Sequence, residues 1–293
     1  MLLPLWRVNA AGMIWETPHG TFNLNRRALI MGVVNVTTDS FSDGGQFIEV
    51  EAAVAQALRL VDQGAEIIDV GGESTRPGAQ PMSEEEELRR VLPVVERLAG
   101  QTRFVVSIDT MKAGVARAAV EHGAAIVNDV TGLRNAAMRD VVKATGAAAI
   151  AMHMQGEPRT MQRAPHYDDV CAEVRVFFRQ IFDACLRSEI NPMRLAFDPG
   201  IGFGKKPAHN LALIRNLDEL RVADRPLVLG VSRKSFIGKV LGSEMLADRE
   251  WPTVALTSYG RARGAQVFRV HEARANAEAL RMTEAILNSE PAA

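Results

Sequence analysis

The chain has 293 residues, of which 47% are hydrophobic and 24% charged, the proportions of a typical globular protein. With 34 basic and 35 acidic residues, its net charge of −1 argues against nucleic-acid binding and against a polybasic membrane-binding surface. Cys171 and Cys185 lie in one predicted helix about 21 Å apart. They are therefore too far apart for a disulfide, which predicts a reducing, cytoplasmic location. Residues 1–10 do not resemble a signal peptide, and no apolar run approaches the ~20 residues of a membrane span.

Eight short apolar runs recur along the chain and predict buried strands. Each run is continuously apolar, as expected for parallel strands that are covered on both faces. Amphipathic helical stretches separate the runs, whose starts lie about 34 residues apart, close to the length of a βαβ unit. The runs cover residues 28–35, 66–71, 104–109, 125–129, 147–153, 194–198, 227–232 and 265–271. Eight strand-and-helix units favour one closed (β/α)8 TIM barrel over residues 28–290, with an open doubly wound sheet as the alternative.

Two further features concern the ends of elements. Residues 1–27 precede the first strand, and two apolar runs in this segment flank a Pro-His-Gly turn at 18–20. This pattern predicts an N-terminal β-hairpin extension that caps one end of the barrel.

Ser83 opens a predicted helix over 83–99 with a capping-box sequence, and Pro93 is expected to kink that helix.

Polar side chains follow the end of every predicted strand. Because the carboxyl ends of barrel strands meet at one rim, these side chains are expected to converge there, as in barrel enzymes. Carboxylates, an amide and an ammonium suit a flat heterocycle with several donors and acceptors, and the arginines suit a phosphorylated group beside it. These strand-end residues include Asn35, Arg76, Asp109, Asn128, His153, Asp198, Lys234, Arg269 and His271.

Longer motifs occupy the same strand ends in an ordered series. They are MGVVNVTTDSFSDGG (31–45), IIDVGGESTRPG (67–78), SIDT (107–110), NDV (128–130), MHMQG (152–156), DPGIGFGK (198–205), GVSRKSFIG (230–238) and RVH (269–271). In these motifs and their order, the chain resembles the dihydropteroate synthase family of pterin-binding enzymes. The visible departure is Thr38, where the family loop has a proline, so closure of this loop is expected to lose more entropy.

The resemblance implies a transferase of folate biosynthesis with two small-molecule substrates. It would join p-aminobenzoate to (7,8-dihydropterin-6-yl)methyl diphosphate and release pyrophosphate, with Mg²⁺ as cofactor, and it would form a homodimer. The implied path is dissociative, so that diphosphate leaves before the amine attacks the pterin methylene. Asp109, Lys234 and Asp43 would be the catalytic residues. Loops 36–46 and 72–83 are expected to close over the site and exclude water.

The matching positions also assign binding residues. The pterin would contact Asp109, Asn128, Met152, Asp198, Phe203, Lys234 and Arg269. The diphosphate would contact Thr75, Arg76, Arg269 and His271. The p-aminobenzoate would contact Phe41, Thr75, Pro77, Phe203, Lys234 and Ser235. Asn35 would bind Mg²⁺, and because an amide oxygen is a weak neutral ligand, the diphosphate and water are expected to supply most of the metal's ligands.

Three other functions fit parts of the pattern. A lysine at a strand end permits an aldolase that forms a Schiff base through Lys234, although such an enzyme has no need of the Asp-Asn-Asp set. A paralogue that binds pterin without turnover is the second alternative, and the retained diphosphate residues argue against it. A barrel methyltransferase acting on folate is the third, and the Ser-Arg-Lys-Ser and Arg-Val-His motifs disfavour it.

Overall fold

The structure, a computed structural model, describes residues 13–36, 43–74 and 80–289, without the side chains of 43–48. In these residues, eight parallel strands form one sheet, and each falls within a run expected from the sequence. The strands are β3 (Leu29–Asn35), β4 (Ile67–Gly71), β5 (Val105–Asp109), β6 (Ile126–Asp129), β7 (Ala148–Met152), β8 (Leu195–Asp198), β9 (Val228–Leu229) and β10 (Val267–Val270). β9 is shorter than the 227–232 expected, because from Gly230 onward the chain leaves the ladder towards the next helix.

The sheet closes into a barrel. Its strands follow the order β8-β7-β6-β5-β4-β3-β10-β9, in which chain neighbours are adjacent except β8 and β9, which stand at the two ends. The two ends meet at a parallel bridge between Phe197 and Leu227, and the Phe197 N–H donates to the Pro226 carbonyl at 2.9 Å. An open doubly wound sheet has two free edges, so this junction decides for the (β/α)8 barrel.

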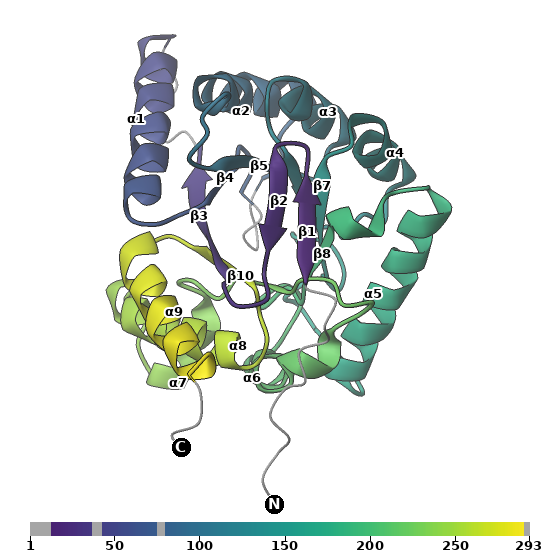
Figure 1. Ribbon diagram of the computed structural model, residues 1–293, viewed down its shortest axis with the longest axis vertical. Helices are drawn as coiled ribbons and strands as arrows, with labels where there is room; N and C mark the ends of the chain where they lie inside the picture. The colour runs from purple at the N-terminus through teal and green to yellow at the C-terminus, as the bar shows by residue number, and fades with distance from the viewer. Residues whose placement is uncertain (1–12, 37–42, 75–79, 290–293) are drawn as a thin grey trace, which may run out of the picture.

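Helices follow the strands and form a ring outside the barrel (Figure 1). Both α7 and α8 lie between β9 and β10, whereas one α-helix follows each of the other strands of the eight-stranded sheet in the described chain. The helices are α1 (Asp43–Asp62), α2 (Glu84–Leu98), α3 (Ala113–Glu121), α4 (Ala136–Thr145), α5 (Val170–Arg187), α6 (Pro207–Arg215), α7 (Ser235–Leu241), α8 (Glu250–Ala262) and α9 (Ala273–Leu287). The Ser83 Oγ accepts a hydrogen bond from Glu86 N at 3.2 Å, which confirms the expected cap, and α2 continues through Pro93.

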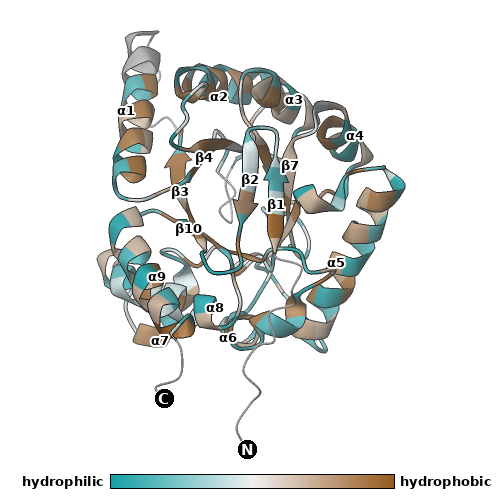
Figure 2. Ribbon diagram, viewed as in Figure 1, coloured by the Kyte–Doolittle hydropathy of each residue, from teal (hydrophilic) through white to brown (hydrophobic). Residues whose placement is uncertain are grey.

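The apolar core has an outer and an inner part. The outer part lies between the strands and the inward faces of the helices, where the apolar residues of both elements meet (Figure 2). The inner part fills the amino-terminal half of the barrel with side chains from the strands. It includes Leu29, Met31, Ile67, Ile126, Ala148, Ile150, Ala196, Val228 and Val267. Because these side chains fill the amino-terminal half of the barrel, only its carboxyl end has room for a site.

An N-terminal hairpin covers the other end, as the sequence predicted. β1 (Ile14–Thr17) pairs antiparallel with β2 (Gly20–Asn23), and Figure 1 shows the pair lying across the barrel. Trp15 is fully buried among the inner core residues, and its Nε1 donates to the Arg194 carbonyl at 3.0 Å. The indole thus closes the amino-terminal end, while the division at residue 27 into extension and barrel stays a prediction.

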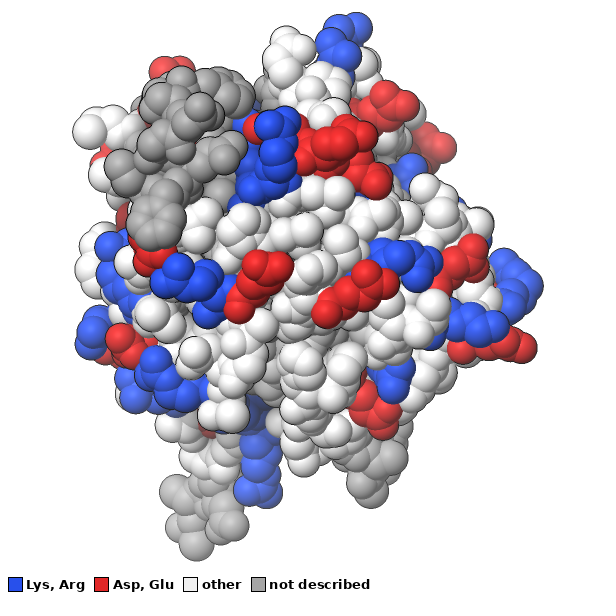
Figure 3. Space-filling model, turned by 90° about the horizontal axis from the view of Figure 1, so that it is seen from above, with Lys and Arg blue, Asp and Glu red and all other residues white. Residues whose placement is uncertain are grey.

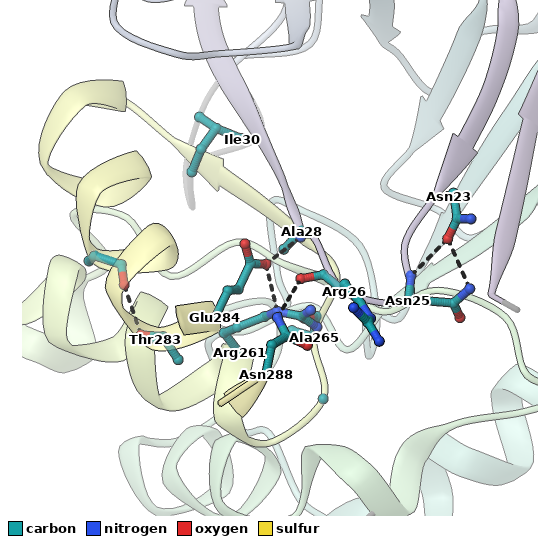
Figure 4. A network of polar contacts seen from close by, with 12 residues as sticks. Asn23, Asn25, Arg26, Ala28, Ile30, Arg261, Ala265, Thr283, Glu284 and Asn288 are labelled. Atoms are coloured by element: carbon teal, nitrogen blue, oxygen red, sulfur yellow. Dashed lines mark hydrogen bonds and ion pairs between the residues drawn. The ribbon is translucent and has the colours of Figure 1, made fainter. Parts of the chain in front are cut away.

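A buried ion pair fastens the last helices to the first barrel strand (Figure 4). Glu284 on α9 accepts hydrogen bonds from Arg261 Nε of α8 at 2.9 Å and from Ala28 N at 2.5 Å. Because the pair also satisfies the backbone N–H next to β3, it holds the chain where the barrel begins.

The surface carries charges of both signs. On the face shown in Figure 3, Lys and Arg side chains alternate with Asp and Glu, without a large area of one sign. Within the described ranges, no helix is long and apolar enough to cross a membrane.

Candidate active site

The two-residue periodicity of the strands points several polar side chains into the carboxyl end of the barrel. Side chains two positions apart on a strand point to the same side, so the residues that lie two after the apolar inner layer also point inward. Asn128 follows Ile126 in this way, and Arg269 follows Val267. The same rule places Met152 after Ile150 and Asp198 after Ala196. Four residues expected for the pterin therefore face one space.

Arg269 holds this group together through two carboxylates. Its Nη2 donates to Asp109 Oδ2 at 2.7 Å, and its Nε donates to Asp69 Oδ2 at 2.6 Å. The same Asp69 oxygen accepts from Asn128 Nδ2 at 3.0 Å. The sequence analysis assigned no role to Asp69, which lies in the middle of β4 and is fully buried. The sequence feature that could have identified it is a carboxylate inside an apolar run. A buried charge requires a partner, so such a residue is expected to bind a basic or polar side chain.

Burial and charge set the ionisation of this network. Burial raises the pKa of Asp109 to about 7, although the Arg269 guanidinium favours the ionised form. Burial alone would lower the pKa of Arg269, but Asp69 and Asp109 outweigh it and hold that pKa above its ordinary value. The second oxygens, Asp69 Oδ1 and Asp109 Oδ1, are buried and have no hydrogen-bond partner among the described residues. The network therefore contains acceptors that a ligand with N–H donors could satisfy.

Asp198 forms the second acidic position. Its Oδ1 accepts from Gly200 N at 2.6 Å. Burial raises its pKa, while the bond from Gly200 and the nearby Lys234 and Arg269 act in the opposite direction. A Cβ at Gly230 would lie 3.6 Å from Asp198 Oδ2 and 3.9 Å from Arg269 Cβ, so the residue after β9 lies close to both side chains.

Lys234 and Phe203 meet beside this acidic position. The Lys234 Nζ lies 4.0 Å from the centre of the Phe203 ring, within the range of a cation–π contact. Phe203 also packs against a small cluster that contains Met152 and Met154. The expected lysine and the expected apolar lining are thus adjacent to the acidic residues.

The remaining described site residues occupy the rim. Asn35 is the exposed last residue of β3, and Ser235 is the exposed first residue of α7. His271 directly follows β10, where its N and Nδ1 lie 3.2 and 2.9 Å from Ser232 Oγ. Asp43 begins α1, but its side chain lies outside the described part. Thr38, Phe41, Thr75, Arg76 and Pro77 also lie outside the described residues.

An ion triad that the sequence analysis did not identify lies next to the rim. Lys112, just before α3, forms ion pairs with Glu73 after β4 and with the fully buried Glu87 of α2. The other Glu73 oxygen accepts from Met82 N at 3.2 Å. The triad therefore ties together the chain on either side of residues 75–79 and the segment that follows Asp109. Its residues are far apart in sequence, so no local pattern indicates the contact.

The comparisons with known proteins agree with this geometry. The model of the pterin binding enzyme family matches residues 31–271. The chain belongs to this family. Dihydropteroate synthase of Escherichia coli is 44% identical over 89% of the chain and 92% of its own length. The solved Xanthomonas albilineans dihydropteroate synthase with 4-aminobenzoic acid is 43% identical, with a TM-score of 0.88 over 96% of this chain and 100% of that one. The Burkholderia cenocepacia dihydropteroate synthase complexed with 7,8-dihydropteroate is 36% identical, with a TM-score of 0.85 over 94% of this chain and 96% of that one.

Proposed function

We propose that this member of the pterin binding enzymes is a transferase that makes 7,8-dihydropteroate. It joins p-aminobenzoate to (7,8-dihydropterin-6-yl)methyl diphosphate and releases pyrophosphate. The observation that carries the proposal is the Asp69–Arg269–Asp109 network, in which the buried Asp109 Oδ1 has no partner among the described residues, because a pterin edge offers N–H donors. Membership of a family rich in dihydropteroate synthases supports the same reaction.

The pterin lies at the carboxyl end of the barrel interior. Asp109, Asn128 and Asp198 accept or exchange hydrogen bonds with its amine and amide groups, and Lys234 donates to its carbonyl. Met152 and Phe203 line the ring, with Arg269 against one face. The contacts of these side chains support this assignment. Arg269 binds Asp109 directly and is linked to Asn128 through Asp69. Lys234 lies over the Phe203 ring, which packs against the cluster that contains Met152.

The diphosphate lies at the rim on Thr75, Arg76, Arg269 and His271, with Asn35 as the protein ligand of Mg²⁺. Asn35 is exposed at a strand end, and the described residues contain no group of three or more acidic, His or Cys side chains that could hold a metal ion. This donor set fits an ion held mainly by diphosphate oxygens and water. When bound, Mg²⁺ would neutralise charge on the leaving diphosphate.

The p-aminobenzoate lies between the pterin and the rim. Its ring contacts Phe203 and the alkyl stem of Lys234, and its carboxylate lies near Ser235, where α7 begins. Phe41, Thr75 and Pro77 complete this subsite. The contact between Phe203 and Lys234 supports the shared position of these two side chains.

The protein assists a dissociative substitution at the pterin methylene by electrostatics. Arg76 and Arg269 stabilise the diphosphate as its bond to the methylene breaks. Asp109, with Asp43 at the start of α1, stabilises the positive charge that develops on the pterin. The amine of p-aminobenzoate then forms the new C–N bond and loses a proton. The segments after β3 and β4, residues 36–46 with the start of α1 and residues 72–83, exclude water, which would otherwise compete for the cation.

The active form is a homodimer that associates through α7 and the start of α8. Large apolar side chains are exposed there and around the turn between the two helices. They are Val240, Leu241, Met245, Leu246 and Trp251, of which Trp251 is 77% exposed. Exposed apolar patches of this kind mark protein interfaces. Sedimentation analysis of wild type and Trp251→Lys tests the assignment, which predicts a dimer and a weakened dimer, respectively. A monomeric wild type would refute it.

A coupled assay of pyrophosphate release tests the reaction. We expect release to require both p-aminobenzoate and Mg²⁺ for sustained turnover, and Asn35→Ala to raise the Mg²⁺ concentration needed for half-maximal rate. Borohydride trapping separates the aldolase alternative, since the proposed reaction forms no adduct at Lys234. A wild type that binds pterin but releases no pyrophosphate would identify a paralogue without turnover.

A further inference from the structure

A buried lysine lies beneath the candidate site and outside the reaction described above. Lys205 follows the glycine-rich loop after β8, and it is 3% exposed. Its Nζ lies 3.0 Å from the Gly200 carbonyl, 2.9 Å from the Phe203 carbonyl and 3.3 Å from the His153 carbonyl. The fourth neighbour is His153 Nδ1 at 3.0 Å. A surface lysine would not collect four acceptors from two separate loops.

These neighbours suit the Lys205 side chain in its charged, ammonium form. Three of the four are carbonyl oxygens, which can only accept. Burial and the adjacent Lys205 lower the pKa of His153 to about 2, so its imidazole is neutral and can also accept at Nδ1. Burial lowers the pKa of Lys205 to about 7, whereas the nearby Asp198 carboxylate favours its charged form. We assign the charged form, because an amine has two hydrogens for four acceptors and an ammonium has three.

The loop that this ammonium braces carries two groups of the site. Gly200 N donates to Asp198, and Phe203 supplies the ring against which Lys234 lies. Lys205 binds the carbonyl of each of these two loop residues. The loop also lies tightly against the end of β7, since a Cβ at Gly200 would come within 1.9 Å of the His153 carbonyl oxygen.

We infer that Lys205 is a positioning residue: its ammonium joins the end of β7 to the loop after β8 and thereby places Phe203 and the Gly200 N–H for pterin binding. The inference deepens the proposed function and rests on its assignment of Asp198, Phe203 and Lys234 to the pterin. Lys205 itself contacts no substrate. Without the ammonium, the carbonyls of His153 and Phe203 lose this donor, while the Gly200 carbonyl keeps the Phe203 N–H at 3.0 Å, so the loop must rearrange to satisfy the first two.

Lys205→Met tests this role, because methionine is of similar length and lacks the charge and the donors. Lys206→Met is the matched control, since Lys206 is the exposed neighbour in the chain. We expect Lys205→Met to raise the dissociation constant for 6-hydroxymethyl-7,8-dihydropterin, measured by calorimetry, at least tenfold, and Lys206→Met to leave it within twofold. In steady-state kinetics, Lys205→Met should raise KM for the pterin diphosphate. A purely structural defect would reduce the active fraction, which lowers the apparent kcat and leaves KM unchanged.

Two outcomes overturn the inference: a dissociation constant for Lys205→Met within twofold of wild type, or a loss of kcat with unchanged KM. If Lys205→Met does not fold, His153→Phe decides, since it removes the imidazole acceptor without supplying another and keeps both a ring and Lys205. We then expect at least a threefold weaker pterin affinity, and an unchanged affinity would refute the role. Failure of the proposed function is distinguishable, because wild type itself would then release no pyrophosphate.

Discussion

Asp69 provides the sharpest test of how the site is held together. One of its oxygens accepts from both Arg269 and Asn128, two residues that we assign to the pterin. Asp69→Asn preserves the size of the side chain and removes its charge. With its amide oxygen in the Oδ2 position, the new asparagine still accepts from Arg269 and Asn128, but as a neutral acceptor; with its NH₂ group in that position, donors oppose donors.

The magnitude follows from the kind of bond that is lost. A hydrogen bond to a charged group contributes about 1.5–3 kcal/mol. Asp69 does not touch the ligand in our assignment, so only part of this energy appears in binding, when Arg269 and Asn128 must be fixed again. We therefore expect a loss of about 1–2 kcal/mol, which corresponds to a pterin affinity roughly 5–30 times weaker.

Calorimetric titration with a pterin measures this change, and Ser107→Ala supplies the control. Ser107 lies directly opposite Asp69 in the register of β4 and β5, is equally buried, and its Oγ has no hydrogen-bond partner among the described residues. We expect its replacement to leave affinity within twofold. If Asp69→Asn binds pterin within threefold of wild type, Asp69 does not position the site and our reading of the network is wrong.

Three further predictions use other parts of the molecule. Because burial raises the pKa of Asp109 to about 7, its carboxylate gains a proton below that pH; pterin affinity should fall about tenfold between pH 8 and pH 6, and titrations of Asp109→Asn should show no such slope. Gly200→Ala should abolish pterin binding, since its Cβ would meet the His153 carbonyl, whereas Gly100→Ala, with a similar φ of +75° and open space, should cost about 1 kcal/mol of stability and no activity. Trp15→Ala should lower the free energy of unfolding in urea by about 3–5 kcal/mol and leave the KM values unchanged, because the indole closes the opposite end of the barrel; a change in KM with unchanged stability would contradict this.

Much of the fold was determined by the sequence alone. Continuous apolar runs predict strands buried on both faces, and the regular spacing of those runs predicts alternating helices. Because parallel strands place their carboxyl ends on one rim, the strand-end residues Asp109, Asp198 and Arg269 could be assigned to one site before any contact was known. Local chemistry also sufficed for the Ser83 helix cap and for the N-terminal hairpin.

Only the tertiary structure decided which partners these residues have. Closure of the barrel depends on contacts between β8 and the start of β9, and strand counting does not reveal them. Asp69 binds Arg269 across 200 residues of chain, and Lys205 finds its acceptors partly at His153, 52 residues away. Such pairs leave no periodic pattern in the sequence. A polar group that is removed from water needs a hydrogen-bond partner, and the fold can supply that partner from any distance along the chain.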